Sequence, residues 1–232
     1  MSSHGGSPAK AILYAFVANL GIAITKTGAA IYTNSGSMLA EAIHSYADCF
    51  NQVLLFLGLK RAARPATEDH PLGYGKASYF WSFIVAIMLF SMGGLFSIYE
   101  GWHKLHEPEE LHQVWIALTV LGVAILLESG SLYGCLKEIG KVREGRPFGE
   151  WFKHTRNAEL VVVLGEDVAA LVGLVLAFVF VSLASVTGDT RFDALGSISI
   201  GVVLVIVAAF IGARIASLLL GKSAEPQLER RI

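Results

Sequence analysis

The sequence is short of charge. Charged residues make up 16% of its 232 positions, against roughly a quarter in an average soluble domain. Hydrophobic residues reach 54% and the mean hydropathy is +0.57, more apolar surface than a soluble fold of this length could cover. The formal net charge of −1 provides no excess of basic residues for nucleic acid. These shortages exclude an ordinary soluble domain and indicate no nucleic-acid partner.

Cysteine is also scarce. The chain has 2 cysteines, Cys49 and Cys135, both inside apolar runs and neither in a CxxC pair. We therefore expect two packing residues and no disulfide. The first residues, MSSHGGSPAK, are polar and do not read as a cleavable signal peptide.

Long apolar runs fill most of the chain. A membrane-spanning helix needs roughly 20 such residues, and a membrane strand only about 10. The runs are long enough for helices, which satisfy their own backbone hydrogen bonds in lipid. The sequence predicts an all-α membrane protein with six transmembrane helices in one domain, 11–221, after an N-terminal tail, 1–10. The predicted helices are about 11–33, 38–62, 79–103, 112–137, 158–185 and 194–220.

Most of the 18 Lys and Arg residues lie in one set of segments, namely both chain ends and the loops at 63–77 and 138–157. The opposite set holds only Lys104 and Arg191. The positive-inside rule then places both termini in the cytoplasm. The loop at 63–77 is rich in Pro and Gly and should be irregular.

One predicted helix carries a continuous polar stripe. At 100° per residue, its polar side chains fall within an arc of about 100° that should face the bundle interior. His44 and Asp48 are one turn apart in this stripe. An imidazole nitrogen and a carboxylate oxygen at that spacing can bind one metal ion, and zinc accepts both ligand types. The alternative is a buried His–Asp hydrogen bond that only holds helices together. The stripe comprises Ser37, Glu41, His44, Asp48, Asn51 and Gln52.

The predicted helix at 158–185 supplies two adjacent acids, Glu166 and Asp167. Ionisable groups inside a membrane are costly and need a reason. Adjacent helical residues point about 100° apart, so one of the two acids should complete a site with His44 and Asp48. Lys26 is either a counter-ion for Glu166 or Glu41, or a side chain that extends to the nearer interface.

Three further features leave alternatives open. Glu128 belongs either to the ion pathway or to a local hydrogen-bond network. Asp193 is predicted to cap the last helix, with lining of the exit path as the alternative. The small residues Gly93, Gly94 and Ser97 should permit close helix contacts.

Three motifs together resemble the cation diffusion facilitator family, most of all the branch of the zinc transporter 9 homologues. They are SMLAEAIHSYADCFNQ followed by HPLGYGK, LGED, and DALGS. The resemblance implies a six-helix transmembrane domain, usually dimeric, that exports Zn²⁺ or a similar ion in exchange for protons. The family's first ligand pair maps onto His44 and Asp48. Of its second pair only Asp167 is matched, since Val163 stands at the histidine position, and Glu166 is the candidate replacement.

The resemblance also bears on the cytoplasmic side. Some relatives hold a second metal site in the loop at 63–77, but this chain keeps only His70 and has Tyr74 at a second histidine position. We therefore expect no full site there. Family members continue into a small α/β cytoplasmic domain, and residues 222–232 stand where it would begin.

Together these features predict a homodimeric, multi-pass protein of the cell inner membrane that moves divalent metal ions, zinc favoured, out of the cytoplasm. Alternating access would expose the site, and protons would compete for its ligands. An exporter of Mn, Fe, Co or Cd ions is an alternative, since oxygen-rich sites suit harder ions. A non-transporting metal-binding scaffold is another, because of Val163. An enzyme using His44 and Asp48 as an acid–base pair is disfavoured, because membrane acyltransferases resemble HxxxxD instead.

Overall fold

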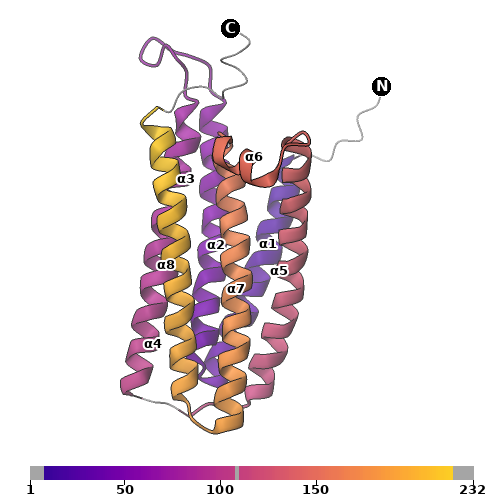
Figure 1. Cartoon of the computed structure of the whole chain (residues 1–232), viewed down its shortest axis with the longest axis vertical. Coiled ribbons are helices and arrows are strands. Elements are labelled where there is room, and N and C mark those ends of the chain that lie inside the picture. The colour runs from indigo at the N-terminus through magenta and orange to yellow at the C-terminus, as the bar shows by residue number, and fades with distance from the viewer. Residues whose placement is uncertain (1–7, 108–109, 222–232) are drawn as a thin grey trace.

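The computed structural model describes residues 8–107 and 110–221, and its named elements are all helices. They are α1 (Pro8–Thr33), α2 (Gly36–Ala62), α3 (Lys76–Met88), η1 (Leu89–Leu95), α4 (Phe96–His106), α5 (Val114–Val142), α6 (Phe148–His154), α7 (Ala158–Thr187) and α8 (Arg191–Leu219). The long helices run side by side, and α1 begins at the same end of the bundle at which α8 ends (Figure 1). The predicted all-α class is confirmed. Most of the predicted tail, and the segment 222–232, lie outside the described residues.

Four helical stretches in the described part of the chain are long and apolar enough to cross a membrane. These are Lys76–His106, Val114–Val142, Ala158–Thr187 and Arg191–Leu219. The helices α1 and α2 have 26 and 27 residues, which is long enough to span, but they are not among the four. The polar stripe of α2 lowers its mean hydropathy. A multi-pass membrane fold is therefore shown, and the count of six spans stays a prediction.

Two segments differ from the sequence-based prediction. The predicted loop at 138–157 is largely helical, because α5 continues to Val142 and α6 forms a further short helix. Trp151 of α6 is buried in a small cluster with Cys135, Ile139 and Leu164, and this burial holds the short helix in place. The predicted helix at 79–103 is longer and contains η1, a π-helix of 7 residues. The loop at 63–77 is irregular as predicted, with one antiparallel bridge between Thr67 and His70.

The π-helix η1 packs closely against α8. A Cβ atom added to Gly94 would lie 2.6 Å from Cγ2 of Val205, and one added to Gly201 would lie 2.7 Å from the carbonyl oxygen of Gly94. No side chain fits between backbones at that distance. The predicted role of Gly94 in a close helix contact is confirmed. π-Helical segments inside α-helices are frequent at functional sites, and a Cβ atom added to Gly93 would lie 3.8 Å from Nδ1 of His44.

The helix α2 lies inside the bundle. It contacts α1, α3, η1, α4, α7 and α8, so its polar stripe has other helices around it. Leu89, Leu174 and Leu204 are fully buried in the apolar core that surrounds it. Polar side chains in such surroundings must find partners within the protein or leave their atoms unsatisfied.

Candidate metal-binding site

The start of α2 is fixed by a carboxylate from another helix. Oδ1 of Asp193, on α8, accepts hydrogen bonds from the Ser35 hydroxyl (2.7 Å) and the Ser37 backbone N–H (3.2 Å), and its Oδ2 accepts one from the Gly36 N–H (2.5 Å). Ser35 also caps α2 locally, because its hydroxyl oxygen accepts from the Met38 N–H at 3.1 Å. A carboxylate at a helix N-terminus satisfies free N–H groups and complements the helix dipole. The prediction that Asp193 caps its own helix is wrong: it caps α2.

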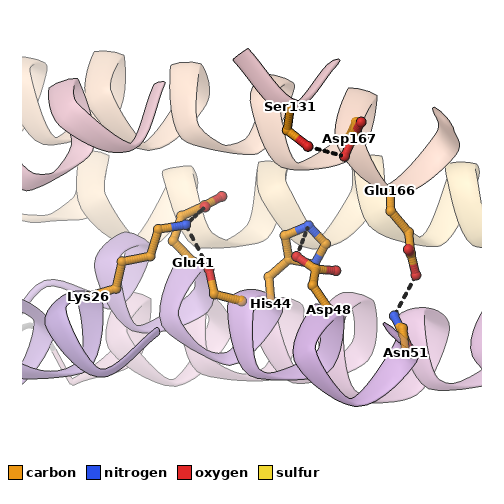
Figure 2. Close-up of polar contacts among 9 residues, drawn as sticks. Lys26, Glu41, His44, Asp48, Asn51, Ser131, Glu166 and Asp167 are labelled. Atoms are coloured by element: carbon orange, nitrogen blue, oxygen red, sulfur yellow. Dashed lines mark hydrogen bonds and ion pairs between the residues drawn. The ribbon is translucent and has the colours of Figure 1, made fainter. Parts of the chain in front are cut away.

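One turn along α2, Glu41 forms an ion pair with Lys26 of α1. Nζ of Lys26 lies 3.2 Å from Oε2 of Glu41 and donates to the Ser45 hydroxyl at 2.8 Å. The side chains of Lys26 and Glu41 are both 0% exposed. Of the predicted alternatives for Lys26, the counter-ion for Glu41 is confirmed, and extension to an interface is wrong because burial and pairing hold the ammonium inside the bundle (Figure 2).

The next pair along α2 is His44 and Asp48. Nε2 of His44 lies 3.6 Å from Oδ2 of Asp48, and their side chains are 1% and 18% exposed. This distance is too long for a hydrogen bond. Within the described part of the chain, neither His44 ring nitrogen nor Oδ1 of Asp48 has a hydrogen-bond partner. The predicted alternative of a His–Asp hydrogen bond that only holds helices together is therefore not formed.

The two adjacent acids of α7 diverge, as predicted from helical geometry. Glu166 is buried and accepts a hydrogen bond from Nδ2 of Asn51 on α2 at 2.6 Å. Asp167 turns toward α5 and accepts one from the Ser131 hydroxyl at 3.2 Å. Figure 2 shows three polar pairs following one another along α2, and Asp167 directed toward Ser131. Oδ2 of Asp167 has no hydrogen-bond partner among the described residues.

A small polar cavity adjoins Asp48. It has a volume of about 10 Å³ and is lined by Asn19, Ile22, Ser45, Asp48 and Glu128. That is close to the smallest volume that holds one water molecule. The cavity places Glu128 of α5 beside Asp48, and both predicted roles of Glu128, in an ion pathway or in a local hydrogen-bond network, stay open.

The four predicted ligands are not gathered around one point in this conformation. Among the described residues, no three His, Cys, Asp or Glu side chains are close enough to hold a metal ion. His44 and Asp48 lie together, whereas Glu166 is held by Asn51 and Asp167 by Ser131. A site of three or four ligands would therefore require α2 and α7 to bring these side chains closer.

The loop between α2 and α3 contains a ring stack. The His70 and Tyr74 rings lie 4.3 Å apart between centroids, and the Tyr74 hydroxyl is 3.2 Å from that of Thr67. Tyr74 thus packs on the histidine face.

Sequence reasoning missed the partners of the two acids on α7. Asn51 was within the predicted stripe, but its pairing with Glu166 crosses 115 positions, and no local pattern predicts such a contact. Ser131 gave a weak signal, because it lies three residues after Glu128 and so on the same face of α5.

The helical bundle, with its apolar exterior and its buried ionisable groups, is that of a polytopic membrane protein. The sequence matches the cation efflux transmembrane domain over residues 12–220. The chain therefore belongs to the cation diffusion facilitator family, and the resemblance to the zinc transporter 9 branch is confirmed by its relatives.

Two relatives from animals and one from a plant illustrate the similarity. The chain is 34% identical over 227 residues to the "Proton-coupled zinc antiporter SLC30A9, mitochondrial" of Xenopus laevis, covering 97% of this chain and 41% of that protein. The human protein of the same name is 32% identical over 227 residues, covering 97% and 40%. "Metal tolerance protein C4" of Arabidopsis thaliana is 30% identical over 220 residues, covering 94% and 48%. The chain spans less than half the length of these relatives.

Proposed function

We propose that this chain is the transmembrane part of a proton-coupled exporter of divalent metal ions, with zinc favoured, centred on His44 and Asp48. One observation carries the proposal: an imidazole whose two buried nitrogens have no hydrogen-bond partner among the described residues lies beside a carboxylate on a helix inside a membrane bundle. A metal ion would supply the partner that these atoms lack, since neutral imidazole and carboxylate are zinc ligands. The names of the relatives, a zinc antiporter and a metal tolerance protein, support the same substrate class.

The proposed topology has six membrane spans with both termini in the cytoplasm. The basic loops support this orientation, as does the shared end at which α1 begins and α8 finishes (Figure 1). We further propose a multi-pass homodimer in the cell inner membrane, in contact with lipid. The family supports an assembly of this kind.

The proposed mechanism starts from the separation of the acids on α7 from His44. The ion first binds His44 and Asp48, and α7 then approaches α2 so that Asp167 or Glu166 completes the ligand set. Glu166 is held through Oε1 by a 2.6 Å hydrogen bond from Asn51, whereas Asp167 accepts a longer one (3.2 Å) from Ser131 through Oδ1, and its Oδ2 has no hydrogen-bond partner among the described residues. Protons entering from the opposite side compete for the same groups, because metal binding requires a neutral imidazole and ionised carboxylates. Proton entry thereby drives release.

Reconstitution into liposomes tests this proposal. Zinc uptake is followed with a Zn²⁺-sensitive dye and proton movement with a pH-sensitive dye. We expect Asp48→Ala and His44→Ala to lose nearly all metal-dependent proton flux, and Asp189→Asn, in the exposed turn between α7 and α8, to retain it. Zinc transport by Asp48→Ala at the parent rate would show that the site is assigned wrongly.

Two alternatives remain within this site. The acids near His44 favour harder ions such as Mn²⁺ or Fe²⁺, and competition of Mn²⁺, Fe²⁺, Co²⁺ and Cd²⁺ against Zn²⁺ in the same liposomes ranks them. The other is a metal-binding scaffold without transport, favoured by Val163 at the position of a family ligand. It predicts calorimetric binding of zinc with no flux in liposomes.

A further inference from the structure

The ion pair between α1 and α2 has the composition of a cation site. Nζ of Lys26 lies between a carboxylate oxygen of Glu41 (3.2 Å) and the hydroxyl oxygen of Ser45 (2.8 Å). Carboxylate and hydroxyl oxygens are ligands that hard cations accept. Here the bound cation is the ammonium group of the chain itself, and both charged side chains are completely buried.

Only one of the two carboxylate oxygens of Glu41, Oε2, is paired with Lys26. Its Oε1 is buried and has no hydrogen-bond partner within the described residues. A Cβ atom added to Gly173 of α7 would lie 2.5 Å from this oxygen, so a glycine makes the room into which the carboxylate fits. An ion pair that served only to join α1 and α2 would be expected to satisfy both oxygens, since an unsatisfied buried acceptor costs stability.

This pair is next to the proposed metal site. Glu41 precedes His44 by three residues, a rise of about 4.5 Å along the helix. Ser45, which accepts from Lys26, also lines the small cavity that contains Asp48 and Glu128. The pair lies on the side of His44 toward the start of α2, the end of the bundle away from the start of α1 (Figure 1).

Charge at this distance matters for a divalent ion. A unit charge roughly 8 Å from a divalent ion, at an effective dielectric constant of about 20, changes the ion's affinity by roughly a thousandfold. With Lys26 in place, Glu41 adds no net negative charge to its surroundings. Without Lys26, an unpaired carboxylate would lie one turn from His44.

We propose that Glu41 and Ser45 form a second cation subsite, which the Lys26 ammonium fills as a tethered cation. Lys26 keeps this subsite closed to the transported ion and lowers the ion's affinity for His44 and Asp48, so that the ion can leave. Lys26 is thus a positioning residue that sets affinity without contacting the metal. This inference rests on the proposed function for the identity of the ion.

Three variants test the subsite through the sign of their effects. Lys26→Met keeps the side-chain length and removes the charge, so we expect a KM for Zn²⁺ lower by at least about tenfold, together with a lower kcat because release slows. Glu41→Gln leaves the ammonium uncompensated, so we expect a KM higher by at least about tenfold. The double variant Lys26→Met/Glu41→Gln is net neutral again, and its KM should return to within about threefold of the parent value.

Controls separate this role from a structural one. Lys26→Arg keeps the charge and should keep the parent KM, and thermal unfolding of each variant in detergent shows whether it is folded. A purely structural pair would lower stability in both single variants and move KM in the same direction or not at all. That result, or a double variant with the KM of Lys26→Met, would overturn the subsite.

Calorimetric titration with Zn²⁺ alone gives a second measure of the same order of affinities, independent of flux. We expect Lys26→Met to bind Zn²⁺ most tightly and Glu41→Gln least tightly; equal affinities in the parent, the two single variants and the double variant, or the reverse order, would overturn the subsite. Flux by the parent protein tests the proposed transport. Each idea can therefore fail while the other stands.

Discussion

Removing the Asp193 carboxylate should destabilise the protein, because this side chain makes a buried contact between two helices that are distant in the sequence. The Asp193→Ala substitution leaves the N–H groups of Gly36 and Ser37 and the Ser35 hydroxyl without their acceptor. Each buried, unsatisfied polar group costs about 1–3 kcal/mol. The Ser35 hydroxyl can rotate toward other acceptors and keeps its own capping bond, so we expect a loss of about 3 kcal/mol in the free energy of unfolding.

The assay is thermal unfolding in detergent at a fixed scan rate, followed by tryptophan fluorescence. For a chain of this size, about 3 kcal/mol corresponds to a Tm lower by roughly 6–12 °C. Asp193→Asn keeps one carbonyl acceptor and should lose about half as much. The matched control is Asp189→Ala, whose carboxylate lies in the exposed turn and accepts from the Arg191 N–H. A Tm for Asp193→Ala within about 2 °C of that control would refute the reasoning.

Three other outcomes follow from the packing and the site. Gly201→Ala places a Cβ atom 2.7 Å from the Gly94 carbonyl oxygen and should lower the free energy of unfolding by about 1–3 kcal/mol. The control Gly122→Ala, whose Cβ atom would have nothing within 4 Å, should leave the Tm unchanged or higher. Equal Tm values for the two variants would contradict the close contact of η1 and α8. Asp167→Asn should weaken calorimetric Zn²⁺ binding more than Glu166→Gln, because the hydrogen bond that holds Glu166 (2.6 Å, from Asn51) is shorter than the one that holds Asp167 (3.2 Å, from Ser131), and Oδ2 of Asp167 has no hydrogen-bond partner among the described residues. The reverse order would assign the ligand to Glu166. Zn²⁺ affinity should fall as pH falls, because protons occupy the imidazole and carboxylate groups. Titrations between about pH 7.5 and pH 5.5, a range that brackets the ordinary pKa of histidine, check this, and affinity independent of pH would exclude His44 as a ligand.

The long helices were predictable because apolar runs of this length have few other structures in a membrane. Their ends were less predictable. The start of α2 depends on Asp193, which is more than 150 positions away from Ser35 in the sequence. The helix α6 was missed because a segment of 7 residues in a basic, polar stretch resembles a loop. It is stabilised by contacts with distant helices, through the burial of Trp151 against α5 and α7 and the stacking of Phe152 on Phe210 of α8.

The polar stripe was predictable from helical periodicity alone, but its pairings were not. The spacing of Glu41, His44 and Asp48 fixes one shared face of α2. It leaves open which group on another helix meets each side chain, because that depends on packing across the bundle. Lys26 therefore had two candidate carboxylate partners in the sequence, Glu41 and Glu166, and in the structure it pairs with Glu41.

The pairings along α2 differ in how well they satisfy the buried atoms. At the start of α2, Asp193 of α8 accepts three hydrogen bonds, and further along α2 the side chain of Asn51 donates to Glu166. Between these contacts, both nitrogens of His44 and one oxygen of Asp48 have no hydrogen-bond partner within the described residues. Native proteins leave few buried polar groups unsatisfied, and a role in helix packing alone would leave these atoms as a cost without a benefit. A cation bound between His44 and Asp48 would satisfy them together, which is why the proposed site is placed there rather than at the better-paired ends of the stripe.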